Sequence, residues 1–292
     1  MPELPEVETV RRGLAPYLTG ARIETVTLNR KDLRFAFPER FAARLEGQTI
    51  ESVGRRAKYL LFSLGGAGIW LSHLGMTGAY RFEDRLIAEP TRYRAAHPAG
   101  HDHVEMVLSH PSEGRLALVY ADPRRFGFMD LFAREADSAF LRDLGPEPLS
   151  NAFNTDAIAQ RLRGKKAPMK AALLDQSVVA GLGNIYVSEA LHRAHIRPDA
   201  AAATLVGADG TPDPRLDLLV RAVRLVLEEA IAAGGSTLKD FRNAQGDSGY
   251  FQHRFRVYDK AGEPCPTPGC TGTILRMVQS GRSSFFCPVC QH

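Results

Sequence analysis

Cysteine is absent from the first 264 of the chain's 292 residues, and all four cysteines lie within the last 28. This crowding indicates a local site and argues against a disulfide framework that holds the whole chain together. The sequence also has no apolar run that approaches the length of a membrane span, and no charged start followed by an apolar stretch. We therefore expect a cytosolic protein without a membrane partner.

A strong excess of charge of one sign is missing as well. The chain has 37 Lys and Arg residues and 33 Asp and Glu residues, which gives a net charge of +4. So mild an excess does not by itself identify a nucleic-acid-binding protein. Hydrophobic residues make up 44% of the chain, which is ordinary for a globular protein, and the length allows two or three domains.

The four cysteines are spaced as two pairs. Cys265 and Cys270 are separated by four residues, Cys287 and Cys290 by two, and the residues between the pairs have the pattern of a β-hairpin. This arrangement resembles a zinc ribbon. Four thiolates close a tetrahedral site and leave no position for a substrate water, so we expect one structural zinc ion. Two disulfides are the alternative, which a cytosolic location disfavours.

The apolar pattern changes once along the chain. From about residue 21 to 134, short β-forming runs alternate with Gly-containing turns, which predicts a sandwich of antiparallel strands. Later residues have helical periodicity, and the Ala-, Gly- and Pro-rich stretch over 199–214 predicts a surface loop. We expect an α+β protein with an N-terminal helix and β-sandwich over 1–134, a linker over 135–150, a helical domain with a loop over 151–261 and a zinc ribbon over 262–292.

The chain begins Met1-Pro2-Glu3, and removal of Met1 would leave Pro2 as an N-terminal secondary amine. Such an amine titrates near pH ~8, so part of it is neutral and nucleophilic at neutral pH. Its attack on a sugar carbon gives an iminium ion, which suits elimination chemistry. Residues 4–18 predict a helix whose positive end lowers the pKa of the amine, whereas Glu3 raises it. Alternatively, Pro2 is only the residue that follows the initiator.

Two segments after residue 150 have features that suit phosphate groups. Gly181-Leu182-Gly183-Asn184 separates two helical patterns, and the backbone N–H groups of the second helix start, with the Asn184 amide, suit a phosphate. Five cations also fall within ten residues: Arg161, Arg163, Lys165, Lys166 and Lys170. A cluster of this kind is more often a solvated helix face.

Eight short motifs occur one after another along the chain. They are MPELPEVE at the start, RRAKYL around Lys58, HLGMTG around Met76, HDHVE at His101, DPRRFG at Arg124, LGPEPL, GLGNIYVSEAL around Asn184 and the cysteine ribbon. Together they cover nearly the whole chain, which resembles the formamidopyrimidine-DNA glycosylase family. The resemblance implies a helix-two-turns-helix domain between the β-sandwich and the ribbon. It also implies a monomeric base-excision repair enzyme that removes oxidised purines, such as 8-oxoguanine and formamidopyrimidines, from double-stranded DNA.

The resemblance also implies a catalytic role for four residues. Pro2 would attack C1′ of the damaged nucleotide, and the iminium would drive β- and δ-elimination, which is the AP lyase activity. Glu3 would protonate the sugar ring oxygen. Lys58 would donate a proton or anchor a phosphate, although its strand pattern alone suggests an exposed edge cation. Arg282, beside the turn of the ribbon hairpin, would assist δ-elimination.

Further residues would contact DNA. By resemblance, Met76, Arg124 and Phe126 fill the gap left when the damaged nucleotide flips out of the duplex, and Arg124 faces the estranged cytosine. The ordinary location of Met and Phe is the core, but the neighbouring glycines at 75 and 127 favour exposed loops. The remaining DNA contacts would come from His101, Lys165, Lys170 and Asn184. A loop within residues 234–249 would cap the flipped base.

One feature departs from the family pattern and two other functions stay open. The first cysteine pair has four intervening residues where the usual family form has two, which lengthens one knuckle without removing a ligand. The first alternative function is an endonuclease VIII-like glycosylase for oxidised pyrimidines, although that branch normally has glycine where this chain has Leu4 and lacks the Met-Arg-Phe set. The second is a non-catalytic zinc-ribbon DNA-binding protein, in which Pro2 and Lys58 are dispensable.

Overall fold

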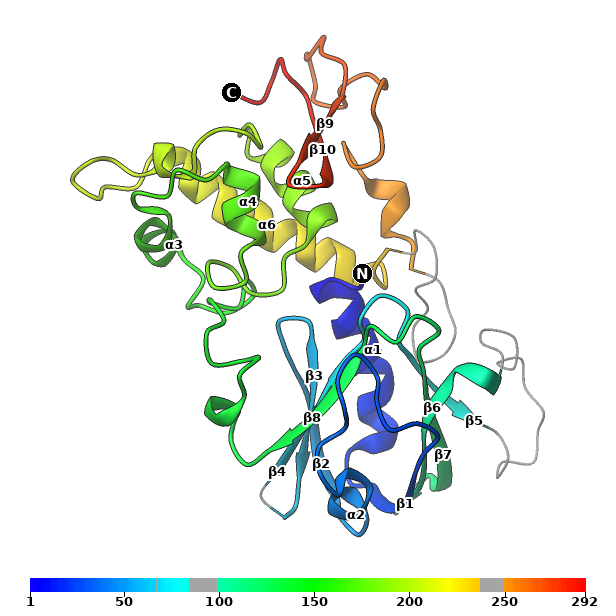
Figure 1. The fold of residues 1–292 in the computed structure, drawn as a ribbon. Coiled ribbons are helices and arrows are strands. Elements are labelled where there is room, and N and C mark those ends of the chain that lie inside the picture. Colours follow the sequence, from blue (N-terminus) through cyan, green and yellow to red (C-terminus); the bar gives the residue numbers. More distant parts are fainter. Residues whose placement is uncertain (67, 84–98, 237–248) are drawn as a thin grey trace. The chain divides into compact units, whose positions relative to one another are not determined.

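The computed structural model describes residues 1–292 except residues 67, 84–98 and 237–248 (Figure 1). The chain forms two compact units. The first comprises Met1–Arg142 and Ala233–Tyr250, and the second comprises Asp143–Ala232 and Phe251–His292. The first unit is thus made of two separate parts of the chain, because Ala233–Tyr250 follows the helices of the second unit in the sequence. This return was not predicted from the sequence. In the part of the chain that the structure describes, no helix has the length and apolar character needed to cross a membrane.

The first unit contains two four-stranded antiparallel sheets (Figure 1). One has the order β1 (Arg22–Leu28), β6 (Asp102–His110), β7 (Gly114–Ala121) and β5 (Ala79–Glu83). The other has the order β2 (Ile50–Arg56), β3 (Tyr59–Leu64), β4 (Gly68–His73) and β8 (Phe128–Phe132). The prediction of antiparallel sheets in this part of the chain is confirmed.

Helix α1 (Leu4–Leu18) packs into one hydrophobic cluster with both sheets. Its residues Val7, Val10 and Leu14 recur at helical spacing and are all buried. The short helix α2 (Phe41–Leu45) adds two further buried side chains to the cluster. Trp70, the single tryptophan of the chain, is fully buried there and stacks on Phe62 with 4.0 Å between ring centroids. The unit therefore has one continuous core between helix and sheets.

The second unit is helical and ends in the ribbon. Its elements are α3 (Thr155–Leu162), α4 (Met169–Leu174), α5 (Asn184–Arg193), α6 (Pro214–Ala232) and the hairpin strands β9 (Leu275–Gln279) and β10 (Arg282–Phe286). Short 3-10 helices lie at Ala99–His101 and Glu135–Asp137 in the first unit and at Ala202–Leu205 and Phe251–Arg254 in the second. The ribbon hairpin occurs where it was predicted, between the two cysteine pairs. The turn between its strands has positive φ at Ser280 and Gly281, as a two-residue hairpin turn requires.

The segment over 199–214 is largely a loop at the surface, as its Ala, Gly and Pro content predicted. It also contains one short 3-10 helix, Ala202–Leu205, which was not predicted. Both Ala202 and Leu205 are buried in the helical unit. Composition alone did not distinguish these apolar contacts from a solvated loop.

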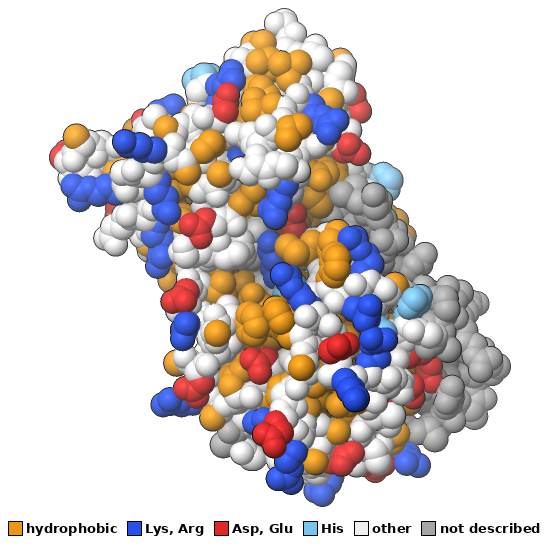
Figure 2. All heavy atoms as spheres, in the orientation of Figure 1, with side chains coloured by type: hydrophobic (Ala, Val, Ile, Leu, Met, Phe, Trp, Pro, Cys, Tyr) orange, Lys and Arg blue, Asp and Glu red, His pale blue; other side chains and the backbone are white. Residues whose placement is uncertain are grey.

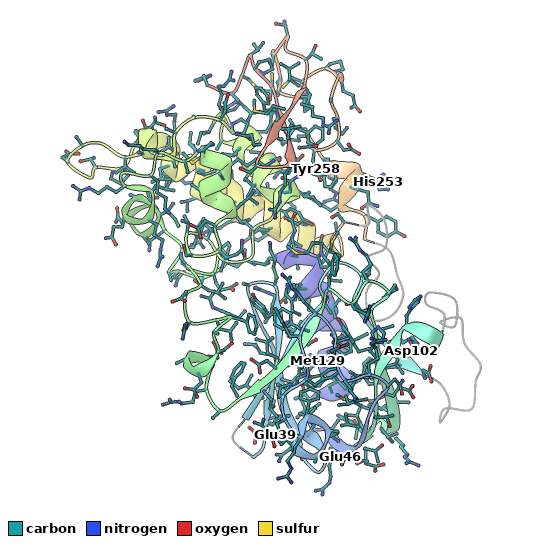
Figure 3. All side chains as sticks on the ribbon, viewed as in Figure 1. Glu39, Glu46, Asp102, Met129, His253 and Tyr258 are labelled. Atoms are coloured by element: carbon teal, nitrogen blue, oxygen red, sulfur yellow. The ribbon has the colours of Figure 1, made fainter. Side chains whose placement is uncertain are left out.

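Helix α5 binds the segment that leads into the ribbon. Glu189 on this helix is fully buried, and its carboxylate accepts the main-chain N–H groups of Arg256, Val257 and Tyr258 at 2.9–3.1 Å. Tyr258, labelled in Figure 3, packs its ring 5.1 Å from that of Phe285 on β10. A carboxylate that satisfies three main-chain donors stabilises the entry to the ribbon.

The core of the first unit can be tested through its tryptophan. Phe62→Ala is expected to lower the free energy of unfolding by about 3–5 kcal/mol, because it leaves a cavity against Trp70. Urea unfolding followed by tryptophan fluorescence measures the change. Ser63→Ala on the same strand is the control, with an expected change below ~0.5 kcal/mol. Equal midpoints for the two variants would contradict the packing described.

Candidate functional site

The first residues of the chain are held at the start of α1. Pro2 and Glu3 are buried, whereas the Met1 side chain is exposed. The Glu6 carboxylate accepts the N–H of Glu3 at 2.8 Å. It also accepts the N–H of Ser236 at 2.8 Å and its hydroxyl at 3.0 Å. Glu6 therefore fixes both the start of α1 and Ser236, a residue far away along the chain.

The terminal amino group lies among charged side chains. In this chain it belongs to Met1, and its pKa is lowered from the ordinary value, mainly by burial. Four side chains act on it besides: Glu3 and Glu6 raise the pKa, and Lys58 and Arg124 lower it. The amine of Pro2, formed when Met1 is removed, would lie among the same groups. A lowered pKa keeps the amine in its neutral, nucleophilic form.

Lys58 occupies the two-residue turn between β2 and β3. It is only 7% exposed, so the alternative of an exposed edge cation does not describe it. The preceding residue, Ala57, has a φ of 52°, and its carbonyl accepts a hydrogen bond from Arg55 at 2.9 Å. Arg55 also donates to Glu8 on α1 at 3.2 Å. The turn that carries Lys58 is thus tied to the helix that begins beside the amine.

The expected wedge residues lie in two turns of the first unit. Met76 follows β4, and Arg124 and Phe126 lie between β7 and β8. Met76 is 38% and Phe126 43% exposed, which is unusual for such apolar side chains. The Arg124 guanidinium lies over the Phe126 ring, 4.7 Å from its centroid. The prediction that both apolar residues lie in exposed loops is confirmed.

Two further residues expected to contact DNA differ in their surroundings. His101 ends the 3-10 helix before β6 and is half-buried, and its carbonyl accepts the N–H of Asp122 at 3.0 Å. Lys165, in the second unit, lies 3.5 Å from Asp175 in a partly exposed ion pair. Such a pair contributes little stability, so Lys165 remains available for another anion.

Lys170 and Asn184 both donate to the carbonyl of Ser283. The distances are 2.7 Å from Lys170 Nζ and 3.0 Å from Asn184 Nδ2. Lys170 is 1% exposed and also donates to the hydroxyl of Ser284 at 2.7 Å. Arg282, one residue before this carbonyl, is exposed at the start of β10. The sequence suggested a phosphate clamp, but in the structure Lys170 holds the hairpin that presents Arg282.

The four cysteines form one group. They are free thiols, and their Sγ atoms all lie within 4.8 Å of one another. The Cys265–Cys290 and Cys270–Cys287 distances are 3.7 and 3.6 Å. Zn–S bonds of ~2.3 Å in a tetrahedron give S···S edges of about 3.8 Å, so the group fits zinc. The prediction of one structural zinc is confirmed, and the longer first knuckle keeps both of its ligands.

His192 is a residue that the sequence did not single out. It is buried on α5, and its Nε2 lies 3.4 Å from Cys265 Sγ and 3.3 Å from Thr267 Oγ1. A proton on Nε2 can be donated to a zinc-bound thiolate, which stabilises its charge. Burial lowers the pKa of His192 to about 4, which favours the neutral ring. No local pattern indicates this contact, because 73 residues separate the two side chains.

Charges of both signs lie on the face that Figure 2 shows. Figure 2 shows Lys and Arg side chains spread over the visible face, with Asp and Glu side chains between them. This agrees with the small net charge. Recognition of an anionic partner would therefore depend on the placement of particular cations such as Arg124 and Arg282.

Three domain families match consecutive parts of the chain. Residues 1–129 match the formamidopyrimidine-DNA glycosylase N-terminal domain, and residues 144–242 match the H2TH domain of the same protein. Residues 262–292 match the zinc finger found in FPG and IleRS. A formamidopyrimidine-DNA glycosylase of Beijerinckia indica is 55% identical over 295 residues, which cover 100% of both chains.

Solved structures are similar over the same extent. The crystal structure of the MutM (FPG) protein of Thermus thermophilus has a TM-score of 0.81 and 40% identity, and covers 99% of this chain and 98% of its own. A Lactococcus lactis FPG mutant in complex with DNA that contains Fapy-dG has a TM-score of 0.82 and 35% identity, with 100% of both chains covered. The similarity thus extends over both units.

Removal of zinc should affect the two units differently. The ribbon has a small core of its own, so loss of the ion is expected to unfold the ribbon and to abolish DNA binding. Trp70 lies in the other unit, and its fluorescence should stay unchanged. A strong chelator, with zinc release and duplex binding measured together, tests this. Unchanged DNA affinity in metal-free protein would contradict a role for the ribbon in binding.

His73 should make stability depend on pH. Burial, aided by Lys58 and Arg34, lowers its pKa from 6.5 to about 4, and its Nδ1 accepts the N–H of Gly75 at 3.1 Å. The unfolded chain therefore binds the proton more readily, and stability present above pH 6.5 is lost as the pH falls toward 4. The expected loss between pH 7 and 5 is about 2 kcal/mol. Urea titrations at both pH values measure it, and His73→Phe should show a smaller loss.

Proposed function

The chain belongs to the formamidopyrimidine-DNA glycosylase family, and we propose that it removes oxidised purines from double-stranded DNA and then cleaves the strand as an AP lyase. The proposed nucleophile is the amine of Pro2 after removal of Met1. One observation carries the proposal: Pro2 and Glu3 are buried, and Glu3, Lys58 and Arg124 act on the terminal amino group. Ionisable groups with perturbed pKa values are concentrated at functional sites, which supports a catalytic role for this terminus.

The proposed reaction uses the amine twice. The Pro2 nitrogen attacks C1′ of the damaged nucleotide and gives up its proton, and the glycosidic bond breaks as the base leaves with a proton. Glu3 protonates the ring oxygen, the sugar opens, and the nitrogen lone pair forms an iminium with C1′. Because the iminium withdraws electrons, loss of a C2′ proton expels the 3′ phosphate. A second proton loss expels the 5′ phosphate, and hydrolysis of the iminium then releases the enzyme.

Two cations complete the proposed catalytic set. Lys58 is buried and acts on the terminal amino group, which suits proton transfer or neutralisation of a neighbouring phosphate. Arg282 is exposed beside the hairpin turn, which suits contact with the strand and assistance of δ-elimination. Zinc, when bound, supplies only the rigidity of the ribbon, because four thiolates fill its coordination sphere.

The proposed DNA contacts divide into wedge and backbone residues. Flipping the nucleotide costs a few kcal/mol, and the exposed Met76 and Phe126 side chains would replace part of the lost stacking. Arg124 would face the estranged cytosine. His101, Lys165 and Asn184 would contact the backbone, and Lys170 would act through the hairpin of Arg282. The proposed enzyme acts as a monomer on chromosomal DNA in the bacterial cytoplasm.

The oxidised-purine branch is favoured over an endonuclease VIII-like enzyme. The chain has the Met-Arg-Phe wedge set, and Leu4 is fully buried in the first turn of α1. The DNA bound to the Lactococcus lactis FPG mutant contains Fapy-dG, an oxidised purine lesion. Both the residues of this chain and the lesion held by its relative support the purine branch.

Covalent trapping tests the nucleophile. Protein without Met1 is incubated with duplex DNA that contains 8-oxoguanine opposite cytosine, and borohydride reduces the iminium. We expect a covalent complex in which mass spectrometry finds the DNA remnant on the Pro2 peptide. The same chain with an N-terminal extension should bind the duplex but should not be trapped, because its Pro2 nitrogen is an amide.

Three results would change the assignment. Equal trapping of the extended chain would show that another amine is the nucleophile. Faster trapping on duplex that contains an oxidised pyrimidine would place the chain in the pyrimidine branch. Binding without any trapping would support the non-catalytic alternative.

A further inference from the structure

Asp122 is a buried acid that the proposed mechanism leaves without a role. It follows β7 and precedes the turn that carries Arg124 and Phe126, and it is 0% exposed. Both of its carboxylate oxygens accept hydrogen bonds. Oδ1 accepts the hydroxyl of Thr77 at 2.5 Å, and Oδ2 accepts the N–H of Gly127 at 2.7 Å. One carboxylate thus joins the turn after β4 to the turn before β8.

Thr77 extends this connection to the wedge itself. It follows Met76 directly, and its hydroxyl oxygen accepts the N–H of Arg124 at 3.2 Å. The hydroxyl therefore donates to Asp122 and accepts from Arg124 at once. A threonine hydroxyl has one hydrogen and two lone pairs, so it can make both contacts at the same time. Its hydrogen is donated to the carboxylate, which only accepts, and a lone pair accepts the main-chain N–H, which only donates.

The main chain of Asp122 joins a third segment. Its N–H donates to the carbonyl of His101 at 3.0 Å, and its carbonyl contacts Nε2 of His103 at 2.9 Å. The same carbonyl accepts the N–H of Arg125 at 3.1 Å. The segments that present Met76, Arg124 with Phe126, and His101 therefore meet at one residue.

Close packing of the two turns adds to these bonds. Gly75 has a φ of +62°, and a Cβ atom at this position would overlap the main chain of Phe126 and Gly127. A Cβ atom on Gly127 would overlap the hydroxyl of Tyr120. The turns are in backbone contact, so neither can move far without the other.

We propose that Asp122 is a positioning residue, which with Thr77 holds the two turns together as one preformed wedge. This inference rests on the proposed function. A carboxylate that accepts two hydrogen bonds in a buried site is a strong tie, because both bonds are charge-assisted. A wedge that is already ordered loses less conformational entropy when it enters the duplex than two independent loops would. Because Asp122 is fully buried, it would act through the two turns and not by contact with DNA.

If Asp122 positions the wedge, its loss should affect the rates on two DNA substrates differently. Excision from duplex DNA requires the wedge to replace a stacked nucleotide. Cleavage at an abasic site in a single strand requires the Pro2 chemistry but displaces no stacked pair. Loss of the tie should therefore slow the first reaction much more than the second.

The experiment compares Asp122→Asn and Thr77→Val with wild type on both substrates. Asn cannot accept on both sides, and Val removes the hydroxyl while keeping the shape of Thr. We expect kcat/KM on duplex 8-oxoguanine to fall by about 10- to 100-fold, because a small misplacement of the groups that position a substrate has an effect of this size. Cleavage of the single strand should change by less than about 2-fold. Fluorescence of 2-aminopurine beside the lesion should report slower flipping in both variants.

Three comparisons keep the inference testable. Thr77→Ser retains the hydroxyl and should restore the duplex rate. The double variant should lose less than the product of the two single losses, because both changes remove the shared bond between Thr77 and Asp122. Asp130→Asn, which changes an acid on β8, is the matched control. Equal loss on both substrates would show a structural role only, and unchanged duplex rates would overturn the inference. A wild-type protein that is inactive on both substrates would instead overturn the proposed function.

Discussion

The structure depends on the way in which the second and third residues of the chain are buried. The first residues of a chain ordinarily fray, because nothing fixes their backbone. Here Pro2 and Glu3 are buried, and the Glu6 carboxylate accepts the N–H of Glu3 as α1 begins. A terminus can serve as a nucleophile only when it is placed as accurately as a side chain, and this single acid supplies the placement. The two sheets and their core form the rigid support against which α1 packs.

The charged residues proposed for chemistry are held by partners within their own units. Lys58 acts on the amine from a turn that Arg55 fixes to Glu8 on α1. In the second unit, Glu189 fixes the segment that enters the ribbon, and Lys170 fixes the hairpin of Arg282. Buried charged groups of this kind stabilise the structure only while every partner is present. The residues proposed for chemistry thus depend on further charged residues that have no proposed chemical role.

Local sequence patterns predicted the helices and strands well, but they predicted poorly the contacts between residues far apart in the chain. Helix α1 and the ribbon hairpin were predicted closely, because periodicity, turn residues and cysteine spacing are local signals. Asp122, Glu189 and His192 were missed, since their partners include residues about 45 to 73 positions away and no local pattern marks such pairs. The burial of Lys170 was missed because it follows four cations in the same short stretch, from which it cannot be told apart by composition.

The return of residues 233–250 to the first unit sets an order of events during synthesis. Glu6 is bound by Ser236, a residue 230 positions later in the chain. At ~5–20 residues per second, a ribosome needs roughly 10–50 s to make that stretch. Until then Glu6 lacks the hydrogen bonds that it accepts from the Ser236 N–H and hydroxyl. The segment that holds the proposed nucleophile therefore gains its last contacts only after most of the chain has been made.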